Sequence, residues 1–324
     1  MQRKTSLRAI ARDLNISAMT LYRVLNNAPG VSASMRQRVT GALDKAGILQ
    51  SVNTRSRKVV LDIQRDPYKS WQAFRLLVKI ANLDYEIQFS NHKLDKELFL
   101  RKCDEADTVI FFSSPTPRIL QEVKQANPDI FRINVFGGKG GDLAVDVDDF
   151  YGGQLAANCF YENGHRNLAV ATVPIEPTQL NRHKSFIGEL SFLAPEGNVY
   201  PILFRETWEE LGESLISLIR EKGVTGVFCT SDHVGYQLQK YLDKKGFSVP
   251  DDVSILSYDV PEHYVRKRLY DIDRIEFEKE TVIRGVEYHL VNRQVRTSEM
   301  SGYYLITPEL VQFGSVKNLN EMKK

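Results

Sequence analysis

From Val59 to Asp259 the chain alternates short apolar runs with longer amphipathic segments. The first apolar runs are VVLDI, YEIQF, TVIFFSS and IFRINVF, and segments such as WQAFRLLVKIANL and RILQEVKQA lie between them. This alternation is typical of an α/β protein, in which parallel strands are joined by crossover helices that cover both faces of the sheet. A second series begins after residue 150 and includes LAVATV, VYPILF, GVFCTS and VSILSYD. Two such series in about 266 residues predict two α/β lobes with a cleft between them.

Two further segments near the end, DIDRIEFEKETVIRGVEYHLVNR and SGYYLITPELVQFGS, can each return to a lobe. We therefore expect a core of residues 59–324. Its first lobe would combine about 59–150 with 267–298, and its second lobe would combine 151–266 with 299–315.

Residues 1–50 have a different pattern. Apolar residues recur there at the spacing of an amphipathic helix, namely Leu7, Ile10, Ala11 and Leu14. Asn15 breaks this run, and Ser17 is a good N-cap for a second helix that ends before Pro29 and Gly30. A third helix is expected in SASMRQRVTGALDKAG, with an inward stripe of Val39, Ala42, Leu43 and Ala46. Three short helices at this spacing predict a helix-turn-helix domain.

Charge is distributed unevenly along the chain. Residues 1–58 contain eleven Lys and Arg but only two acidic residues, a net charge of +9, whereas the remainder carries −7. The total of +2 therefore conceals a basic head on an acidic body. This asymmetry is expected when only the head contacts the phosphates of nucleic acid, although solvated surface charges are the simpler alternative.

The stretch AIARDLNISAMTLYRVLNNAPGVSASMRQRVTGALDKAGI closely resembles the headpiece of the LacI/GalR (lactose repressor/galactose repressor) family of bacterial transcription regulators. The matching positions are Ala11, Ile16, Ser17, Thr20, Arg23, Val24, Asn26, Val31, Ser32, Arg36, Arg38 and Val39. The resemblance implies that the polar face of the second helix lies in the DNA major groove, with Leu21, Val24 and Leu25 turned into the headpiece core. The implied DNA-binding residues are Ser17, Ala18, Met19, Thr20, Arg23, Asn26, Ser32 and Arg36.

The body resembles the same family, whose regulatory core has the fold of periplasmic sugar-binding proteins. The matching segments are AVDVDDFYGGQLAANCFYENGHRNLAVATV, VFCTSDHVG, GFSVPDDVSILSYD and TPELVQFGS. The resemblance is strong in the headpiece and second lobe and weak between Ser51 and about Asn134. It implies an effector site between the lobes.

Two features of that site depart from the family pattern. Leu180 stands where an effector-binding Arg is usual, with Arg182 two residues later, and the usual Asp pair after the last strand of the second lobe is Asp259-Val260. Carboxylates and aromatic rings suit a carbohydrate. The candidate effector residues are Tyr68, Trp71, Ser113, Asp148, Arg182, Trp208, Asp232 and Asp259. Two of these have simpler alternatives, since Trp71 fits a helix core face and Asp232 fits a helix cap.

Residues 51–58 would form a basic linker in place of the family's hinge helix. The family's Pro is Val52 here, its Ala is Ser56, and its Leu would fall on Val59, which starts the first expected strand. Arg55, Arg57 and Lys58 remain able to reach phosphates, but the stretch offers no free apolar wedge to unstack a DNA base step. This predicts little kinking of the operator centre.

No catalytic or cofactor motif is present, so we expect neither an enzyme nor a cofactor. GGKGGD around Lys139 lacks the Ser or Thr of a phosphate loop, and its glycines indicate a flexible loop. The six His and three Cys show no metal-ligand spacing, and reduced thiols suit the cytoplasm. Neither a transmembrane run nor a signal peptide is evident, so no membrane partner is expected.

These observations predict a dimeric repressor that binds double-stranded operator DNA and responds to a carbohydrate-like effector between its lobes. The alternatives are a DNA-binding regulator without an effector, and a two-lobed small-molecule-binding protein without a regulatory role. Sequence-independent binding to labelled duplex DNA, measured against salt, separates a DNA-binding regulator from a binding protein without a regulatory role.

Overall fold

The computed structural model describes residues 7–17, 20, 21, 24, 31–45, 57–63, 67–80, 85–174, 177–259, 271–291 and 302–321. The chain divides into two compact units, residues 1–57 and 58–324. No helix among the described residues is long and apolar enough to cross a membrane.

The first unit contains α1 (Leu7–Asp13) and α3 (Ala33–Lys45), with residues 20, 21 and 24 also helical between them. Asn15 adopts a left-handed backbone with φ 51°, which turns the chain after α1. The Ser17 hydroxyl then accepts a hydrogen bond from the Thr20 amide at 3.0 Å, which confirms the predicted N-cap.

A small apolar core holds this unit together. Its buried members are Ile10, Ala11, Leu21, Val24 and Val39. The inward orientation predicted for Leu21 and Val24 is therefore confirmed, whereas Leu25 lies outside the described residues.

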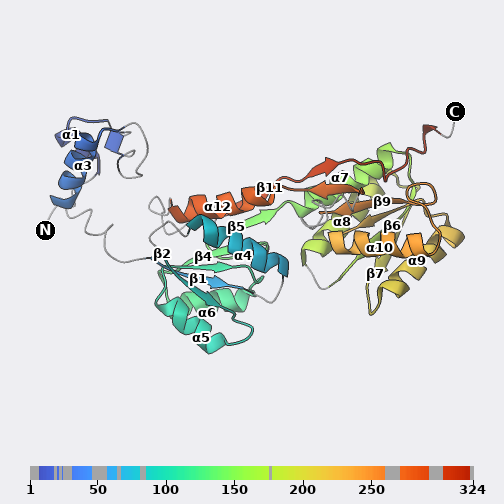
Figure 1. Cartoon of the computed structure of the whole chain (residues 1–324), viewed down its shortest axis with the longest axis horizontal. Coiled ribbons are helices and arrows are strands. Elements are labelled where there is room, and N and C mark those ends of the chain that lie inside the picture. The colour runs from blue at the N-terminus through green and yellow to red at the C-terminus, as the bar shows by residue number, and fades with distance from the viewer. Residues whose placement is uncertain are drawn as a thin grey trace. The chain divides into compact units, whose positions relative to one another are not determined.

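The first sheet of the second unit has the strand order β11-β5-β4-β3-β1-β2. Its strands are β1 (Arg57–Asp62), β2 (Tyr85–Ser90), β3 (Thr108–Phe111), β4 (Phe131–Val135), β5 (Leu143–Val147) and β11 (Gly302–Ile306). Helices α4 (Pro67–Ile80) and α12 (Lys279–Val291) cover one face, and α5 (Lys96–Asp104) and α6 (Pro117–Ala126) cover the other (Figure 1). Successive side chains of β1 point to opposite faces of the sheet, so Val59 and Leu61 pack toward α4 while Val60 packs toward α5 and α6.

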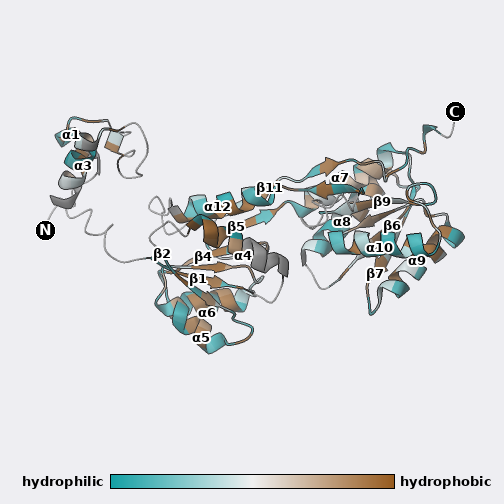
Figure 2. Ribbon diagram, viewed as in Figure 1, coloured by the Kyte–Doolittle hydropathy of each residue, from teal (hydrophilic) through white to brown (hydrophobic). Residues whose placement is uncertain are grey.

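The second sheet has the order β12-β10-β9-β8-β6-β7. Its strands are β6 (Asn167–Thr172), β7 (Asn198–Leu203), β8 (Gly226–Cys229), β9 (Ser254–Tyr258), β10 (Asp273–Glu276) and β12 (Glu309–Val311). Helices α7 (Asp149–Glu162) and α8 (Pro177–Leu193) pack on one face, and α9 (Trp208–Lys222) and α10 (Asp232–Lys244) pack on the other. Figure 2 shows the apolar strands lying beneath helices whose outer faces are hydrophilic. The predicted two-lobed α/β core is therefore confirmed.

Two neighbouring glycines explain how closely α7 approaches its surroundings. A Cβ on Gly153 would lie 1.9 Å from the Ser185 hydroxyl on α8, and one on Gly152 would lie 2.5 Å from the Tyr258 ring. A larger residue at either position would force α7 away from α8 or from the sheet.

The terminal segments are distributed differently from our expectation. Strand β10, expected in the first lobe, pairs with β9 in the second sheet, and β11, expected in the second lobe, pairs with β5 in the first. Only α12 and β12 lie in the expected lobes. Short runs such as DRIE and GYYLI can pair with either sheet, so their partners are set by tertiary packing rather than by local pattern.

The linker boundary also needs correction, because Arg57 and Lys58 belong to β1. The Lys58 amide donates to the Asp107 carboxylate at 2.9 Å, and the Lys58 carbonyl accepts from the Asp107 amide at the same distance. Residues 51–56, including Arg55, lie outside the described residues.

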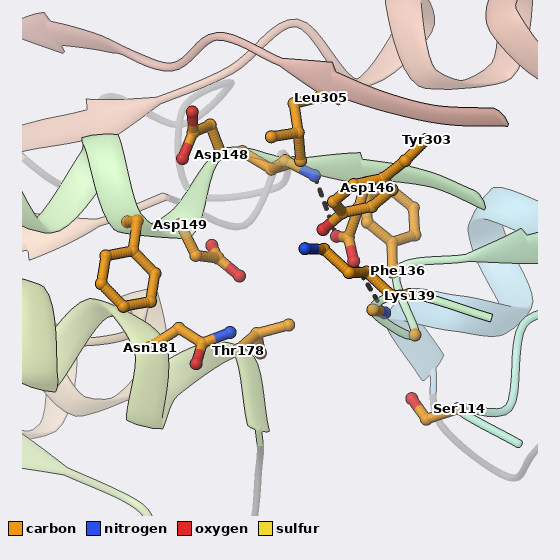
Figure 3. Close-up of a pocket in the computed structure, with 14 residues that line it drawn as sticks. Ser114, Phe136, Lys139, Asp146, Asp148, Asp149, Thr178, Asn181, Tyr303 and Leu305 are labelled. Atoms are coloured by element: carbon orange, nitrogen blue, oxygen red, sulfur yellow. Dashed lines mark hydrogen bonds between the residues drawn. The ribbon is translucent and has the colours of Figure 1, made fainter. Parts of the chain in front are cut away.

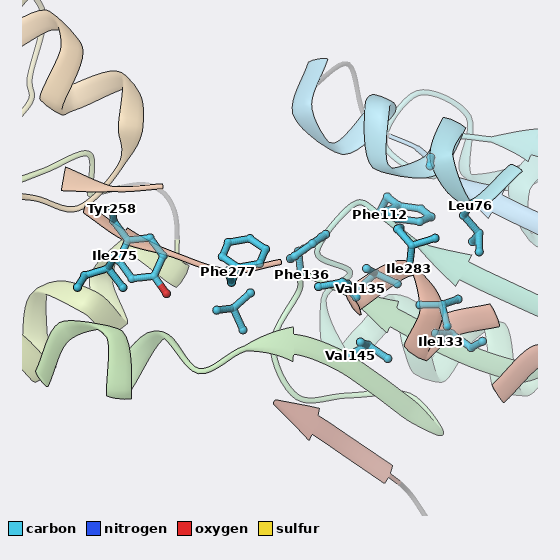
Figure 4. Close-up of a cluster of buried hydrophobic side chains, with 14 of the residues drawn as sticks. Leu76, Phe112, Ile133, Val135, Phe136, Val145, Tyr258, Ile275, Phe277 and Ile283 are labelled. Atoms are coloured by element: carbon cyan, nitrogen blue, oxygen red, sulfur yellow. The ribbon is translucent and has the colours of Figure 1, made fainter. Parts of the chain in front are cut away.

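The two lobes share one apolar core. Phe136, which follows β4, and Phe277, which follows β10, have ring centroids 6.1 Å apart. Figure 4 shows these two rings between the side chains of Tyr258 and Ile275 in the second lobe and those of Ile133 and Val145 in the first.

Candidate functional site

A cavity of about 340 Å³ opens between the two lobes. This volume lies in the range of small-molecule sites. Both lobes contribute to the lining (Figure 3). The lining side chains with polar or aromatic groups are Ser114, Phe136, Lys139, Asp146, Asp148, Asp149, Phe150, Thr178, Asn181 and Tyr303.

The crossover from β5 to α7 supplies three carboxylates from the sequence DVDD. Asp148 is the N-cap of α7, and its Oδ1 accepts from the Tyr151 amide at 2.9 Å. Asp149 begins the helix, where negative charge is stabilised by the helix dipole. Asp146 and Asp149 are buried, and Asp148 is half-buried.

Arg182 on α8 neutralises Asp149. Its Nε donates to Asp149 Oδ1 at 2.7 Å, and its Nη1 donates to the Thr230 carbonyl at 2.9 Å. The guanidinium lies 3.5 Å from the centre of the Tyr258 ring. Burial opposes both charges, so it raises the pKa of Asp149, while Asp149 and Tyr258 hold the pKa of Arg182 above its usual value.

Asp146 fixes the glycine-rich loop 137–141. Its Oδ2 accepts from the Gly138 amide at 2.8 Å, and its Oδ1 accepts from the Val147 amide at 2.9 Å. Asn134 adds a bond from Nδ2 to the Gly138 carbonyl at 2.9 Å. Burial and the nearby Asp149 raise the pKa of Asp146 to about 6. The expected flexible loop is therefore tethered by two side chains.

Lys139 extends from this loop into the cavity, where Figure 3 shows its ammonium on the side facing Asp149. Its Nζ lies 5.5 Å from the centre of the Tyr303 ring. Among the described residues, no carboxylate forms an ion pair with it.

Three of the predicted effector residues lie at the carboxyl ends of second-sheet strands but outside the lining of this cavity. Trp208 packs between Phe204 and His233, with ring centroids 4.3 and 4.9 Å away. Asp232 is the first residue of α10, but Ser231 rather than Asp232 is the N-cap of that helix, so the capping alternative is wrong. Burial and Asp259 raise the pKa of Asp232. Asp259 forms an ion pair with Lys279 at 2.9 Å.

Ser113 lies in a separate buried polar cluster. Its hydroxyl donates to the Asp62 carboxylate, which also accepts from the His92 amide at 2.8 Å and lies 2.7 Å from His92 Nδ1. The neighbouring Ser114, with φ 49°, lines the cavity instead. Tyr68 and Trp71 fall within α4, but their side chains lie outside the described residues.

The predicted DNA-binding residues are described only in part. Ser17 and Ser32 are exposed, and each hydroxyl caps a helix, Ser32 by accepting from the Met35 amide at 3.3 Å. Thr20 and Arg36 are half-buried. The remaining members, Ala18, Met19, Arg23 and Asn26, lie outside the described residues.

Sequence reasoning identified Asp148 in the cavity lining but missed Lys139, Asp146, Asp149, Thr178, Asn181 and Tyr303. One available signal was the general rule that ligands bind at the carboxyl ends of parallel strands, where Asp146 and Asp149 lie. The described residues contain no group of three or more His, Cys, Asp or Glu that could hold a metal ion.

Residues 157–269 match the model of the periplasmic binding protein-like domain. Over most of its length the chain is also similar to curated proteins. The HTH-type transcriptional regulator GntR of Escherichia coli strain K12 is 22% identical over 279 residues, covering 79% of this chain and 82% of that protein. The HTH-type transcriptional repressor PurR of Actinobacillus pleuropneumoniae serotype 3 is 24% identical over 364 residues, covering 98% and 99%.

Solved structures are also similar to this chain over most of its length. The lac repressor dimer bound to operator and the anti-inducer ONPF matches with a TM-score of 0.64 and 15% identity, covering 97% of this chain and all of that one. The chain is therefore similar, over most of its length, to transcriptional regulators, and it has the fold of the LacI family. A LacI family regulator from Enterococcus faecalis V583 with bound ribose has the same fold, with a TM-score of 0.65 at 19% identity over 81% of this chain and 99% of that one.

Proposed function

We propose that this protein is a sequence-specific DNA-binding repressor of the LacI family, controlled by a small carbohydrate-like effector in the cavity between its lobes. The observation that carries this proposal is the combination of a head of net charge +9 with a two-lobed core that encloses a polar cavity. Relatives that span the whole chain are named as transcriptional repressors, and similar structures are described with bound operator or ribose. The protein would act in the cytoplasm as a homodimer, with one helix-turn-helix headpiece for each half-site.

Base selection would come from the start of the second headpiece helix. Ala18 and Met19 are apolar and would contact thymine methyl groups, whereas Arg23 can donate two hydrogen bonds to a guanine. Arg36 would contact phosphate and contribute affinity without sequence preference.

Selection of bound duplexes from random DNA tests the proposal. Wild-type protein should enrich a two-fold symmetric site. Arg23→Ala should reduce the discrimination between bases at one position of that site by about 1–3 kcal/mol. Arg36→Ala, the matched control, should weaken all sequences about equally. If no site is enriched over random DNA at physiological salt, the protein is not a sequence-specific regulator.

A further inference from the structure

Lys139 places a positive charge in the cavity, and none of the described carboxylates forms an ion pair with it. It projects from a loop that Asp146 and Asn134 hold in place, so its backbone is tethered to the site. Its Nζ lies over the Tyr303 ring, 5.5 Å from the ring centre. Lys139 is an exposed residue, so water can solvate its ammonium.

The neighbouring carboxylates already have other partners. Asp149 is neutralised by Arg182 at 2.7 Å, and both oxygens of Asp146 accept backbone hydrogen bonds. Asp148 uses one oxygen to cap α7 and lies across the cavity from Lys139 (Figure 3). Its other oxygen can accept from hydroxyl groups of a ligand.

A ligand that fills this cavity would remove water from Lys139. Covering an ammonium with a neutral group costs free energy, whereas an anionic group supplies a charge-assisted hydrogen bond in return. The aromatic faces of Phe136 and Tyr303 and the polar groups of Thr178 and Asn181 suit a polyhydroxylated ring.

We propose that Lys139 is a specificity-determining residue that selects a carbohydrate bearing an anionic group, either a carboxylate or a phosphate, over the corresponding neutral sugar. This inference rests on the proposed effector site. In the bound state the anionic group contacts Lys139, and hydroxyl groups at the other end of the ligand donate to Asp148.

Thermal-shift and calorimetric titrations of the full-length protein with matched sugars test this assignment. The sets are glucose, glucuronate and glucose 6-phosphate; galactose, galacturonate and galactose 6-phosphate; and ribose, ribonate and ribose 5-phosphate. Inorganic phosphate at equal concentration corrects for anion binding to the basic first 58 residues. The variants are Lys139→Gln and Lys139→Arg, with Lys184→Gln as the matched control, because Lys184 is exposed on α8 and does not line the cavity.

The expected result is that an acid or a phosphate stabilises the wild type beyond the effect of inorganic phosphate and of its neutral partner. Lys139→Gln should weaken that ligand roughly tenfold or more, as expected for loss of a charge-assisted hydrogen bond, while Lys184→Gln and Lys139→Arg retain most of the affinity. Whether the acid or the phosphate binds identifies the anionic group.

Three results would overturn the inference: binding of neutral members alone, equal binding of a charged member by Lys139→Gln, or no binding in any set. Operator selection by the wild type reports on the proposed function separately, because it does not require Lys139. A selected operator with a neutral effector would therefore reject this inference and retain the proposed function.

Discussion

The rings of Phe136 and Phe277 meet at a centroid separation of 6.1 Å and an interplanar angle of 52°. One follows a strand of the first sheet and the other follows a strand of the second, so the pair joins the apolar interiors of both lobes. Any effector in the cavity, which Phe136 also lines, would act close to this junction.

Phe277→Ala should lower the free energy of unfolding by about 3 kcal/mol, because it removes a buried ring and leaves a cavity. Urea denaturation followed by circular dichroism measures the change. Phe192→Ala is the matched control, since that ring is 82% exposed and its loss should cost little. Equal stability of the two variants would show that the junction contributes nothing to the fold.

Asp149→Asn should destabilise the protein by about 3–5 kcal/mol, because it leaves the Arg182 charge buried without its partner. Arg182→Met should also destabilise the protein, because it leaves the buried Asp149 carboxylate without its ion-pair partner. The double variant should be more stable than the sum of the two single effects predicts, with a coupling of about 1–3 kcal/mol in a double-mutant cycle. Additive losses would mean that the two side chains act independently.

His165 should make stability depend on pH. The ring is buried between the Thr225 hydroxyl at 2.8 Å and the Lys317 carbonyl at 3.0 Å, and this burial lowers its pKa to about 4. The unfolded chain, with an ordinary pKa near 6.5, binds this proton more readily, so stability should fall as the pH drops from about 6.5 to 4, by at most about 3 kcal/mol.

His165→Gln should flatten that part of the stability profile, measured by urea denaturation at several pH values. His233→Gln is the control, because His233 is exposed. If stability still falls to the same extent below pH 6.5 in His165→Gln, His165 is not the group responsible for this pH dependence.

Asp273→Asn should loosen the segment that follows β12. The buried carboxylate accepts backbone hydrogen bonds from Phe313, Gly314 and Val316, and an amide can accept at only one of its two terminal atoms. We expect a loss of about 1.5–3 kcal/mol and faster hydrogen exchange at these three amides. Asp271→Asn, on the exposed residue two positions earlier, should leave exchange unchanged.

The linker prediction concerns the DNA rather than the protein core. Since Arg57 and Lys58 are part of β1, the predicted linker shortens to residues 51–56, whose sequence SVNTRS contains no large apolar side chain except Val52. We expect little bending at the operator centre in a circular-permutation assay, and weak dependence on the base sequence there. A strong central kink would show that residues 51–56 insert into the minor groove.

Local chemistry made much of the fold predictable from the sequence. Ser17 caps a helix because its hydroxyl reaches an amide three residues later, and Val59, Val60 and Leu61 alternate between two faces because a strand has period two. The α/β class follows from the same kind of short-range pattern. The resemblance to the LacI/GalR family was recognisable because the headpiece motifs stand in register over a short stretch.

Only the tertiary structure decided the sheet memberships of β10 and β11 and the contents of the cavity. Arg182 was expected to meet a ligand, but Asp149 neutralises it, 33 positions earlier in the chain. Lys139 was expected in a flexible loop, but Asp146 and Asn134 hold that loop at the cavity. The physical reason is that a charged side chain acquires its role from whichever partner the fold brings within hydrogen-bonding distance, and sequence spacing does not encode that distance.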